Sequence, residues 1–509
     1  MSELKLFNSL TRELATFKPI HPGTEGDPND PPEARVYTCG PTVYNYQHIG
    51  NMRAYIFADT LGRVLTYKGY KLTHVVNITD VGHLTSDADA GEDKMEKMAA
   101  NLGKSAWDIA AYYQADFERD LDRLNVRKPA HPKATDYVEQ MIVWGQAIAD
   151  EHCYELDSGL YFDTSTVADY GRLARHSTDD GEHRIDPVDG KRHAADFAIW
   201  RKTPAGETRQ MEWDSPWGKG APGWHLECSV MSEALLGLPF DIHTGGIDHR
   251  EIHHPNEIAQ NQARCHSDAS GANIWMHNNF LIERSGKMSK SSGEFLRVQL
   301  LIDKGFHPLA YRLMCLQAHY RSELEFSWEG LQAAFVRLKR MVMGVTALKA
   351  RHAELVSTSI VPNEPPVEAD KWTLKQVQGD GEFVGGLASN LKGIDDTISE
   401  DLNTAVALVT LDVILLQPNF SPAVKLKAIA AVDSVLGLNL LTLTRTDLRI
   451  RPKGAVITEA EIEAALAARK EARAAKDFAR SDAIRDDLIA KGVEVMDGDP
   501  LGWDWKLDV

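Results

Sequence analysis

The order of the elements expected in the first eighty residues constrains the fold more than any other feature of this chain. Residues 34–39 (ARVYTC) read as a β-strand that ends at Gly40 and Pro41. Residues 52–68 carry apolar side chains at helical spacing, and residues 71–78 (KLTHVVNI) read as a second strand. A strand, loop, helix and strand in this order form the unit of a parallel, doubly wound sheet. We therefore predict an α/β fold with a Rossmann-like parallel-sheet core.

Composition places the chain among ordinary globular proteins. Hydrophobic residues make up 43% of its 509 residues and charged residues 26%, and the length suits about three domains. The first residues show neither the apolar core of a signal peptide nor the Arg-rich pattern of a transit peptide. No run approaches the roughly 18 apolar residues of a membrane span. We therefore expect a cytoplasmic protein with no membrane partner.

Cysteine usage and charge narrow the possible functions. Five cysteines at irregular spacing do not form a disulfide framework, so packing, metal binding and catalysis are their expected uses. The net charge of −18 argues weakly against nucleic-acid binding, because phosphate contacts require Lys and Arg. A large acidic protein can still carry a local basic face. Charge therefore leaves both possibilities open.

Beyond the first unit, mixed regions give way to helices. The elements expected are helices over most of 101–152, strands at 159–162 and 240–243, a helix near 257–265, a long helix over 326–352, helices through 383–437 and a small unit over about 455–509. The Pro- and Glu-rich stretch 356–370 reads as a linker. One stripe of a helix carries Leu402, Val406, Val409 and Val413. The second half of the chain is therefore expected to be mainly helical.

Two short motifs carry the chemistry of nucleotide binding. His48-Ile49-Gly50-Asn51 stands where the first strand passes into the first helix, and there a glycine and a helix N-terminus favour phosphate. Lys287-Met288-Ser289-Lys290-Ser291 is a cationic, hydroxyl-rich loop that can stabilise a leaving pyrophosphate. Either motif alone is also typical of an ordinary surface loop. Their joint presence in this order indicates the two halves of one ATP site.

Four residues could form a metal site. Cys39 ends the first strand, Cys228 follows a Gly/Pro-rich loop, and His253 and Glu257 share one face if that segment is helical. Two thiolates, an imidazole and a carboxylate suit Zn²⁺. His254 could replace His253 on sequence alone, and a lone cysteine is more often a buried small hydrophobe.

Longer stretches resemble the cysteinyl-tRNA synthetase family across nearly the whole chain. They are TCGPTVYNYQHIGN, GAPGWHLECS, FDIHTGGIDHREIHHPNEIAQ, SGKMSKSSG, HYRSELEFS and EDLNTAVAL. The resemblance implies a class I aminoacyl-tRNA synthetase with a Rossmann-like core, a helical-bundle region and a small C-terminal domain. Its domains would be a catalytic domain at 1–300 with an inserted connective segment at about 100–220, a stem-contact region at 301–350, a helical anticodon-stem-binding domain at 351–450 and an anticodon-recognition domain at 451–509.

The same resemblance implies roles for individual residues. One Zn²⁺ per chain would be bound by Cys39, Cys228, His253 and Glu257. The catalytic residues would be His48, Asn51, Lys287 and Lys290. MgATP would lie at Gly50, Gly246, Asp248 and Lys290, and cysteine at Thr79 and Trp224. The expected partners are tRNA(Cys), L-cysteine and ATP, and the expected oligomeric state is a monomer.

Three positions depart from the family pattern. Asn51 stands where many class I synthetases have a second histidine, but it keeps a hydrogen-bond donor. Pro255 replaces an acidic residue; since proline allows a helix to start there, Glu257 should keep its place. The acidic-Asp-Lys sequence that usually follows Asp80 closely arrives late, at residues 92–94, which indicates an insertion.

The expected activity is ATP-dependent formation of cysteinyl-adenylate and transfer of cysteine to the 3′ end of tRNA(Cys). One alternative is a ligase that passes cysteine to an amino-sugar, as in the mycothiol pathway; such ligases lack the long extension that follows the lysine-serine loop here. The other is a non-catalytic tRNA-binding paralogue, against which the intact motifs argue.

The C-terminal unit bears on this choice. Arg469, Arg473, Lys476 and Arg480 recur at spacings of four, three and four, which predicts one helical face that contacts phosphates, or a solvated face with local ion pairs. Trp503 and Trp505 could stack on unpaired bases or close a small core.

Overall fold

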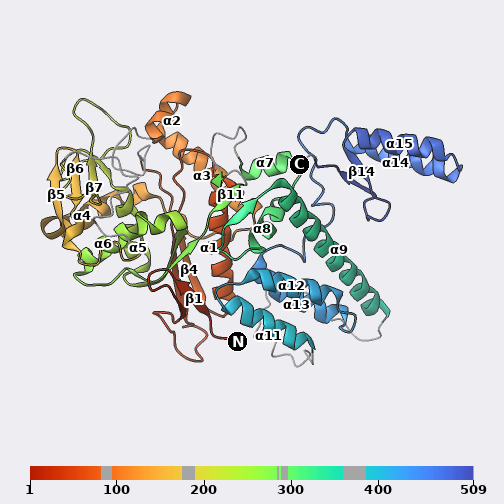
Figure 1. Cartoon of the computed structure of the whole chain (residues 1–509), viewed down its shortest axis with the longest axis horizontal. Coiled ribbons are helices and arrows are strands. Elements are labelled where there is room, and N and C mark those ends of the chain that lie inside the picture. The colour runs from red at the N-terminus through yellow and green to blue at the C-terminus, as the bar shows by residue number, and fades with distance from the viewer. Residues whose placement is uncertain (82–93, 175–189, 284–285, 288–295, 359–385, 508–509) are drawn as a thin grey trace.

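The computed structural model describes residues 1–81, 94–174, 190–283, 286–287, 296–358 and 386–507. A parallel sheet and helix α1 form its centre (Figure 1). An inserted sheet with its helices lies on one side of this centre, and a group of long helices lies on the other. The last unit, α14 and α15, projects from the helical side (Figure 1).

The central sheet has four parallel strands in the order β10-β9-β3-β4. Its strands are β3 (Glu33–Thr38), β4 (Lys71–Val76), β9 (Phe240–Gly246) and β10 (Ala272–Asn278). Helix α1 (Ile49–Tyr67) connects β3 to β4, so the predicted strand–helix–strand unit is confirmed. The strand order reverses between β3 and β9, and ligands of open α/β sheets bind beyond the carboxyl ends of the strands at such a point.

An antiparallel sheet is inserted along the sequence between β4 and β9 and lies to one side of the central sheet (Figure 1). It is formed by β5 (Cys153–Leu156), β6 (Gly159–Phe162), β7 (Phe197–Lys202) and β8 (Gly220–Pro222), after helices α2 (Lys94–Leu102), α3 (Ala106–Arg123) and α4 (Val138–His152). The buried side chains of Trp144 and Trp200 belong to one hydrophobic cluster with Trp275 of β10. The insertion is therefore packed firmly against the core.

Two helices return the chain from the insertion to the sheet. Helix α5 (Trp224–Leu236) starts directly after β8, and α6 (His253–Cys265) follows β9 and a single 3₁₀ turn at Ile247–Arg250. The N-termini of α1, α5 and α6 all come just after strand ends. These three helix starts supply most of the residues that were expected at the site.

The second half is helical, as predicted. Strands β11 (Leu281–Glu283), β12 (Gly286–Lys287) and β13 (Leu324–Phe326) form a small mixed sheet, and the helices are α7 (Val298–Asp303), α8 (Pro308–Leu316), α9 (Trp328–Thr358), α11 (Gly386–Ser399), α12 (Thr404–Leu416) and α13 (Pro422–Leu436). A domain boundary at residue 350 would cut α9. Of the stripe predicted for this region, Leu402 precedes α12 and is buried, whereas Val406, Val409 and Val413 lie in α12 and are exposed.

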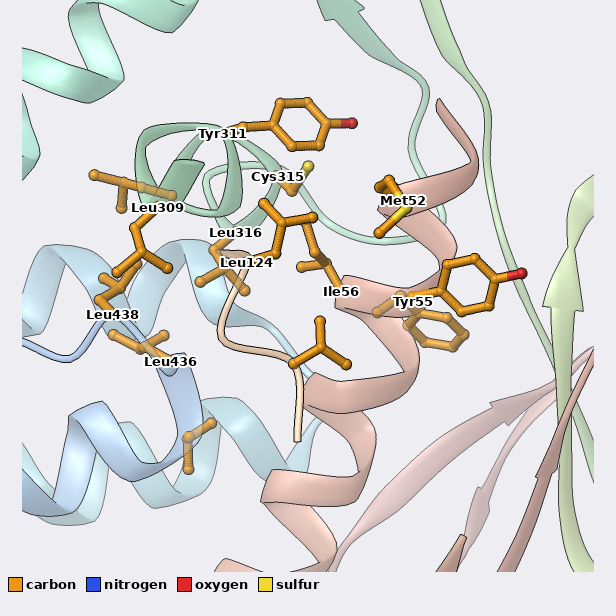
Figure 2. Close-up of a cluster of buried hydrophobic side chains, with 14 of the residues drawn as sticks. Met52, Tyr55, Ile56, Leu124, Leu309, Tyr311, Cys315, Leu316, Leu436 and Leu438 are labelled. Carbon is orange, nitrogen blue, oxygen red and sulfur yellow. The ribbon is translucent and has the colours of Figure 1, made fainter. Parts of the chain in front are cut away.

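The half that contains the parallel sheet and the helical half share one hydrophobic core. Figure 2 shows Met52 and Ile56 of α1 facing Leu316 of α8, with Leu436 and Leu438 at the end of α13 packed beside them. All five side chains are buried. Because α1 follows His48 directly, the position of its first turn depends on packing that the helical half contributes.

The C-terminal unit has its own core. Helices α14 (Glu459–Ala474) and α15 (Phe478–Ala490) pack on a hairpin of β14 (Val493–Val495) and β15 (Trp503–Trp505). Trp503 and Trp505 are buried there, so they close the core and are not available for base stacking. Among the described residues, no helix combines the length and the apolar character that crossing a lipid bilayer requires.

The predicted basic stripe is wrong. Helix α14 ends at Ala474, and Lys476 adopts a left-handed backbone conformation (φ +59°) between the two helices. Arg469 is buried and paired with Asp497 at 3.0 Å, and Arg473 approaches the same carboxylate at 3.5 Å. These basic residues therefore do not lie along one helical face.

Candidate metal centre and nucleotide site

The residues expected to bind a metal gather where the strand order reverses. Cys39 follows β3, and its backbone N–H donates to the carbonyl of Thr244 in β9 at 3.1 Å. Gly40 must be a glycine, since a Cβ there would lie 1.4 Å from the carbonyl oxygen of Asn77. This close crossing turns the Cys39 thiol into the protein interior at the carboxyl edge of the sheet.

Four donor groups from three parts of the chain meet there. Helix α5 supplies Cys228, and α6 supplies His253 and Glu257 from consecutive turns of one face. Their ligand atoms and that of Cys39 all lie within 4.8 Å of one another, and all four residues are buried. Cys39 Sγ is 4.0 Å from Cys228 Sγ, and His253 Nε2 is 3.1 Å from Glu257 Oε1. Pro255 lies in the first turn of α6, where the missing N–H costs nothing.

The chemistry of this set fits a zinc ion. The hydrogen bond from Cys39 lowers the pKa of Cys228 to about 6, while burial raises that of Cys39, so one thiolate forms near neutral pH. Burial alone would raise the pKa of Glu257, but the charges of His243 and His253 hold it at about 2. The site thus concentrates a thiolate and a carboxylate in a buried space that a cation can neutralise.

A second set of donors overlaps the first. Cys39 and Glu257 also lie within 4.8 Å of His243 and His254, the residue that could have replaced His253 on sequence alone. His254 Nε2 is 3.2 Å from Cys39 Sγ, and its Nδ1 bonds with His277 at 2.8 Å. Only the first set contains two thiols, and soft thiolate ligands favour zinc. Donor chemistry therefore favours the set with His253.

Several orienting residues were missed by the sequence analysis. His243 Nε2 contacts Glu257 Oε2 at 2.8 Å, and His225 Nδ1 contacts His253 Nδ1 at 2.8 Å. His243 thus contacts the Glu257 oxygen that His253 does not contact, and His225 contacts the ring nitrogen of His253 that Glu257 does not contact. His243 occupies β9 opposite Trp275 of β10 and stacks on its ring. The signal was the clustering of histidines in FDIHTGGIDHREIHH, but only strand register shows which of them face inward.

Thr79 and Trp224 lie close to the metal set. The ring of Trp224, the first residue of α5, lies 4.2 Å from that of His253 and is partly exposed. Thr79 is buried, and its hydroxyl donates to Glu227 Oε2 at 2.9 Å; burial raises the pKa of this carboxyl to about 8. One aromatic ring thus lies against His253, and one hydroxyl is bonded to the carboxylate that directly precedes Cys228.

His48 and Asn51 cap the first turn of α1. His48 Nδ1 accepts the N–H of Gly50 at 3.0 Å, and the Asn51 side chain accepts the N–H of His48 at 3.3 Å. Because Nδ1 accepts, the ring proton lies on Nε2, which can donate elsewhere. The remaining N–H groups of the helix start and its dipole favour an anionic group.

The other expected nucleotide residues are only partly described. Gly246 ends β9 and Asp248 lies in the following turn, at the same edge of the sheet as Cys39. The backbone of Lys287 forms β12. Lys290 and the rest of 288–295 lie outside the described residues, as does the insertion before residue 94.

Two family models match the chain. The model described as tRNA synthetases class I (C) catalytic domain matches residues 26–336. The model described as Cysteinyl-tRNA ligase anticodon binding domain matches residues 458–500.

Curated relatives match along almost the entire length. The chain is 65% identical to a cysteine–tRNA ligase of Novosphingobium aromaticivorans, covering 99% of this chain and 97% of the relative. It is 50% identical to that of Zymomonas mobilis, covering 98% and 97%. Among solved structures, Mycobacterium tuberculosis methionyl-tRNA synthetase bound by methionyl-adenylate has a TM-score of 0.50 at 14% identity and covers 80% of this chain and 90% of its own. That likeness concerns the fold alone.

Proposed function

The chain belongs to the cysteine–tRNA ligase family, and we propose that its buried thiol, imidazole and carboxylate set selects the amino acid in the reaction of that family. The protein is an enzyme that activates cysteine with ATP and charges tRNA. Transfer to an amino-sugar and a non-catalytic role are not favoured, because the anticodon-binding match at 458–500 and the full-length relatives fit a tRNA ligase.

The observation that carries the proposal is the meeting of Cys39, Cys228, His253 and Glu257 within 4.8 Å. A zinc ion bound there would supply a soft Lewis acid with affinity for a thiolate. Trp224 and Thr79 would bound the space for the amino acid on the side of α5 and β4. Serine differs from cysteine by one atom, and shape alone separates such substrates only about 10–200-fold. Donor chemistry, not shape, is therefore the proposed source of selectivity.

The remaining residues would position and stabilise charge. The cysteine carboxylate attacks the α-phosphorus of ATP, and pyrophosphate leaves. His48 and Asn51 would hold the phosphates at the start of α1, Gly50 would let them approach, and Gly246 and Asp248 would contact the adenosine. Lys287 and Lys290 would stabilise the leaving pyrophosphate. A 3′-terminal hydroxyl of tRNA(Cys) then attacks the carbonyl carbon, and AMP leaves.

We also propose the substrates, the metal content and the oligomeric state of the enzyme. MgATP and L-cysteine are the small substrates and tRNA(Cys) is the macromolecular partner, with one zinc per chain. The enzyme acts as a cytoplasmic monomer. The four-part division at about residues 300, 350 and 450 is part of the proposal, with the second boundary moved to the end of α9 at Thr358.

Cysteine-dependent ATP–pyrophosphate exchange on the purified full chain tests this function. We expect exchange with cysteine, none above background with serine, charging of tRNA(Cys), and about one zinc per chain by metal analysis. Exchange that selects cysteine equally well in fully metal-free protein would overturn the role of the four donors. Absence of exchange in zinc-loaded protein would overturn the function itself.

A further inference from the structure

Arg53 is a buried charged residue to which the proposed mechanism assigns no role. It lies on α1, one turn after Gly50, and only 2% of its surface is exposed. Among the salt bridges of the described residues, none involves Arg53. Burial lowers the pKa of its guanidinium, so the native fold bears a cost for placing a cation there.

Four backbone carbonyls surround this guanidinium. Nη1 donates to the carbonyls of Asn279, at 2.8 Å, and Phe280. Nη2 donates to the carbonyls of Ser322, at 2.6 Å, and His319, at 3.4 Å. The planar fork of arginine can reach both segments at once, which a lysine ammonium on a flexible stem cannot do with the same geometry.

The two segments are the support of β11. Asn279 and Phe280 lead directly into β11, which pairs with β12 on one side and β13 on the other. The N–H of Asn279 donates to the carbonyl of Tyr320 at 2.9 Å, and the N–H of Leu324 donates to that of Phe280 at 3.0 Å. Arg53 thus binds the start of the strand and the turn that flanks it.

This strand is adjacent to the first turn of α1. A Cβ placed on Gly50 would lie 3.7 Å from that of Leu281, the first residue of β11. The N–H of Ile49 donates to the carbonyl of Leu296 at 2.9 Å, so chain from both sides of the lysine-serine motif meets the helix start. The side chain of Arg53 is the charged group that joins α1 to this strand.

We infer that Arg53 is a positioning residue for adenylate formation. It holds β11 at a fixed position relative to the start of α1, which carries His48 and Asn51. This inference rests on the proposed function. Groups on the two sides must bind one triphosphate at the same time, and a misplacement of about 1 Å can cost about 100-fold in rate. Arg53 itself is buried and is not one of the residues proposed to contact ATP or cysteine.

Arg53→Lys tests the inference, with Arg312→Lys as its matched control. Arg312 of α8 is also fully buried and donates to the carbonyls of Leu124, Asn125 and Leu436. Unlike Arg53 it also pairs with a carboxylate, that of Asp59, at 2.6 Å, and none of these partners belongs to β11. We expect Arg53→Lys to lower kcat of pyrophosphate exchange about 10–100-fold, with the KM for cysteine changed by less than about threefold. Arg312→Lys should lower the unfolding midpoint comparably but reduce kcat by less than about threefold.

Two further readouts separate positioning from general damage. Hydrogen exchange of peptides spanning 279–283 should become faster in Arg53→Lys but not in Arg312→Lys. In Arg53→Ala, added methylguanidine should restore part of the pyrophosphate-exchange activity. It can enter because a cavity of about 30 Å³, which Arg53 lines with Cys315 and Tyr320, adjoins the space that the side chain leaves.

Equal kcat losses in the two lysine variants, or an Arg53→Lys loss confined to the KM for cysteine, would overturn the inference. If Arg53→Lys does not fold, the test is made on folded Arg53→Ala. The inference is then overturned if methylguanidine does not raise pyrophosphate exchange by this variant, or does not slow hydrogen exchange of its residues 279–283. The wild-type enzyme is assayed in parallel. Lack of cysteine-dependent exchange in the wild type would instead count against the proposed function.

Discussion

Glu257 has its two carboxylate oxygens held by different histidines. Oε1 is 3.1 Å from His253, the proposed zinc ligand, and Oε2 is 2.8 Å from His243 on β9. A residue held in this way presents one oxygen in a fixed direction. Removing a residue that orients a metal ligand typically lowers metal affinity by about 10–100-fold.

We therefore predict that His243→Gln lowers zinc affinity about 10–100-fold without removing a ligand. Chelator competition on the purified protein measures this. His277→Gln is the matched control, because His277 is equally buried but contacts His254 and Ser9 rather than Glu257. Equal losses in both variants would show that burial, not orientation of Glu257, decides affinity.

Lys290 is expected to act only as pyrophosphate leaves. Lys290→Ala should then slow adenylate formation by about 2–4 kcal/mol in activation free energy and change cysteine binding little. Pyrophosphate exchange and equilibrium binding of cysteine measure the two effects separately. Unchanged exchange in the folded variant would rule out this role.

The residue types of the proposed ligands could be predicted from the sequence, but their orientation could not. Cys39 and Cys228 are two of only five cysteines, and His253 and Glu257 stand in a histidine-rich stretch. His243 became interpretable only through the register that sets it opposite Trp275. His48 was expected at the helix start, yet its tautomer follows from the hydrogen bond to Gly50, which depends on local backbone geometry.

At the scale of elements, three arginines on different segments converge on one carboxylate of α1. Asp59 is buried and bonds with Arg312 of α8 at 2.6 Å, Arg63 at 2.7 Å and Arg127 at 3.4 Å. Burial would raise the pKa of Asp59, but these guanidinium groups, Arg312 first, lower it to about 2. Arg312 and Arg63 also donate to carbonyls at the end of α13, so this group joins the same helices as the core in Figure 2.

Asp59→Asn should destabilise the protein by about 3–5 kcal/mol at pH 7, because it leaves Arg312 buried without a counter-charge. The folded pKa lies below the unfolded value, so this contribution is complete above about pH 5 and is lost as pH falls toward 2. The difference between wild type and variant in urea unfolding should therefore shrink between pH 5 and pH 3, because Asp59 of the unfolded chain binds a proton in this range before Asp59 of the folded chain does. A pH-independent difference would contradict this account.

The first residue of α15 is the most exposed aromatic side chain among the exposed apolar residues of the described part of the chain. Phe478 is 62% exposed, beside Lys476 and Arg480. An exposed ring flanked by cations suits stacking on an unpaired base, the role that the buried Trp503 and Trp505 cannot fill. Phe478 could not be singled out from the sequence, because the predicted helical face ran on past Ala474, where α14 in fact ends.

Phe478→Ala should raise the KM for tRNA(Cys), corresponding to a loss of about 1–3 kcal/mol, and leave pyrophosphate exchange unchanged. Ile489→Ala, another exposed apolar residue of α15, serves as the control. Equal charging by the wild type and Phe478→Ala would exclude stacking at this turn.

The spacing of apolar residues predicted the positions of helices and strands better than it predicted which face of a helix is buried. The strands at 34–39 and 159–162 and the long helix after 326 are present within a few residues. The valines of α12 show the limit, since their spacing identifies a stripe but not its partner, and the structure leaves Val409 exposed. Tertiary packing decides that question.

At the scale of the whole molecule, the C-terminal unit is anchored by charge. Asp504 pairs with Arg445 at 2.5 Å and with Lys339 of α9, and Asp499 pairs with Arg445 at 2.9 Å. The anchor lies on the helical half, away from the residues of the metal centre. Tertiary contacts of this kind join the unit to the enzyme without contributing to its chemical site.

Deleting residues 455–509 should therefore leave cysteine activation within about twofold and sharply reduce charging of tRNA(Cys). The affinity of the full chain for tRNA should fall as salt rises. Steady-state charging at two salt concentrations, with pyrophosphate exchange as the internal control, measures both. Undiminished charging by the shortened chain would show that the unit does not contribute to tRNA binding.

The order of the central sheet has a consequence for synthesis on the ribosome. Strand β3 lies between β4 and β9, but β9 begins about 200 residues after it along the chain. A nascent chain shorter than 240 residues therefore carries β3 with one edge unpaired, and it lacks two of the three proposed co-ligands of Cys39, His253 and Glu257. Such an edge is prone to pair with other chains. Translation through α6 is the step that protects the edge and completes the donor set together.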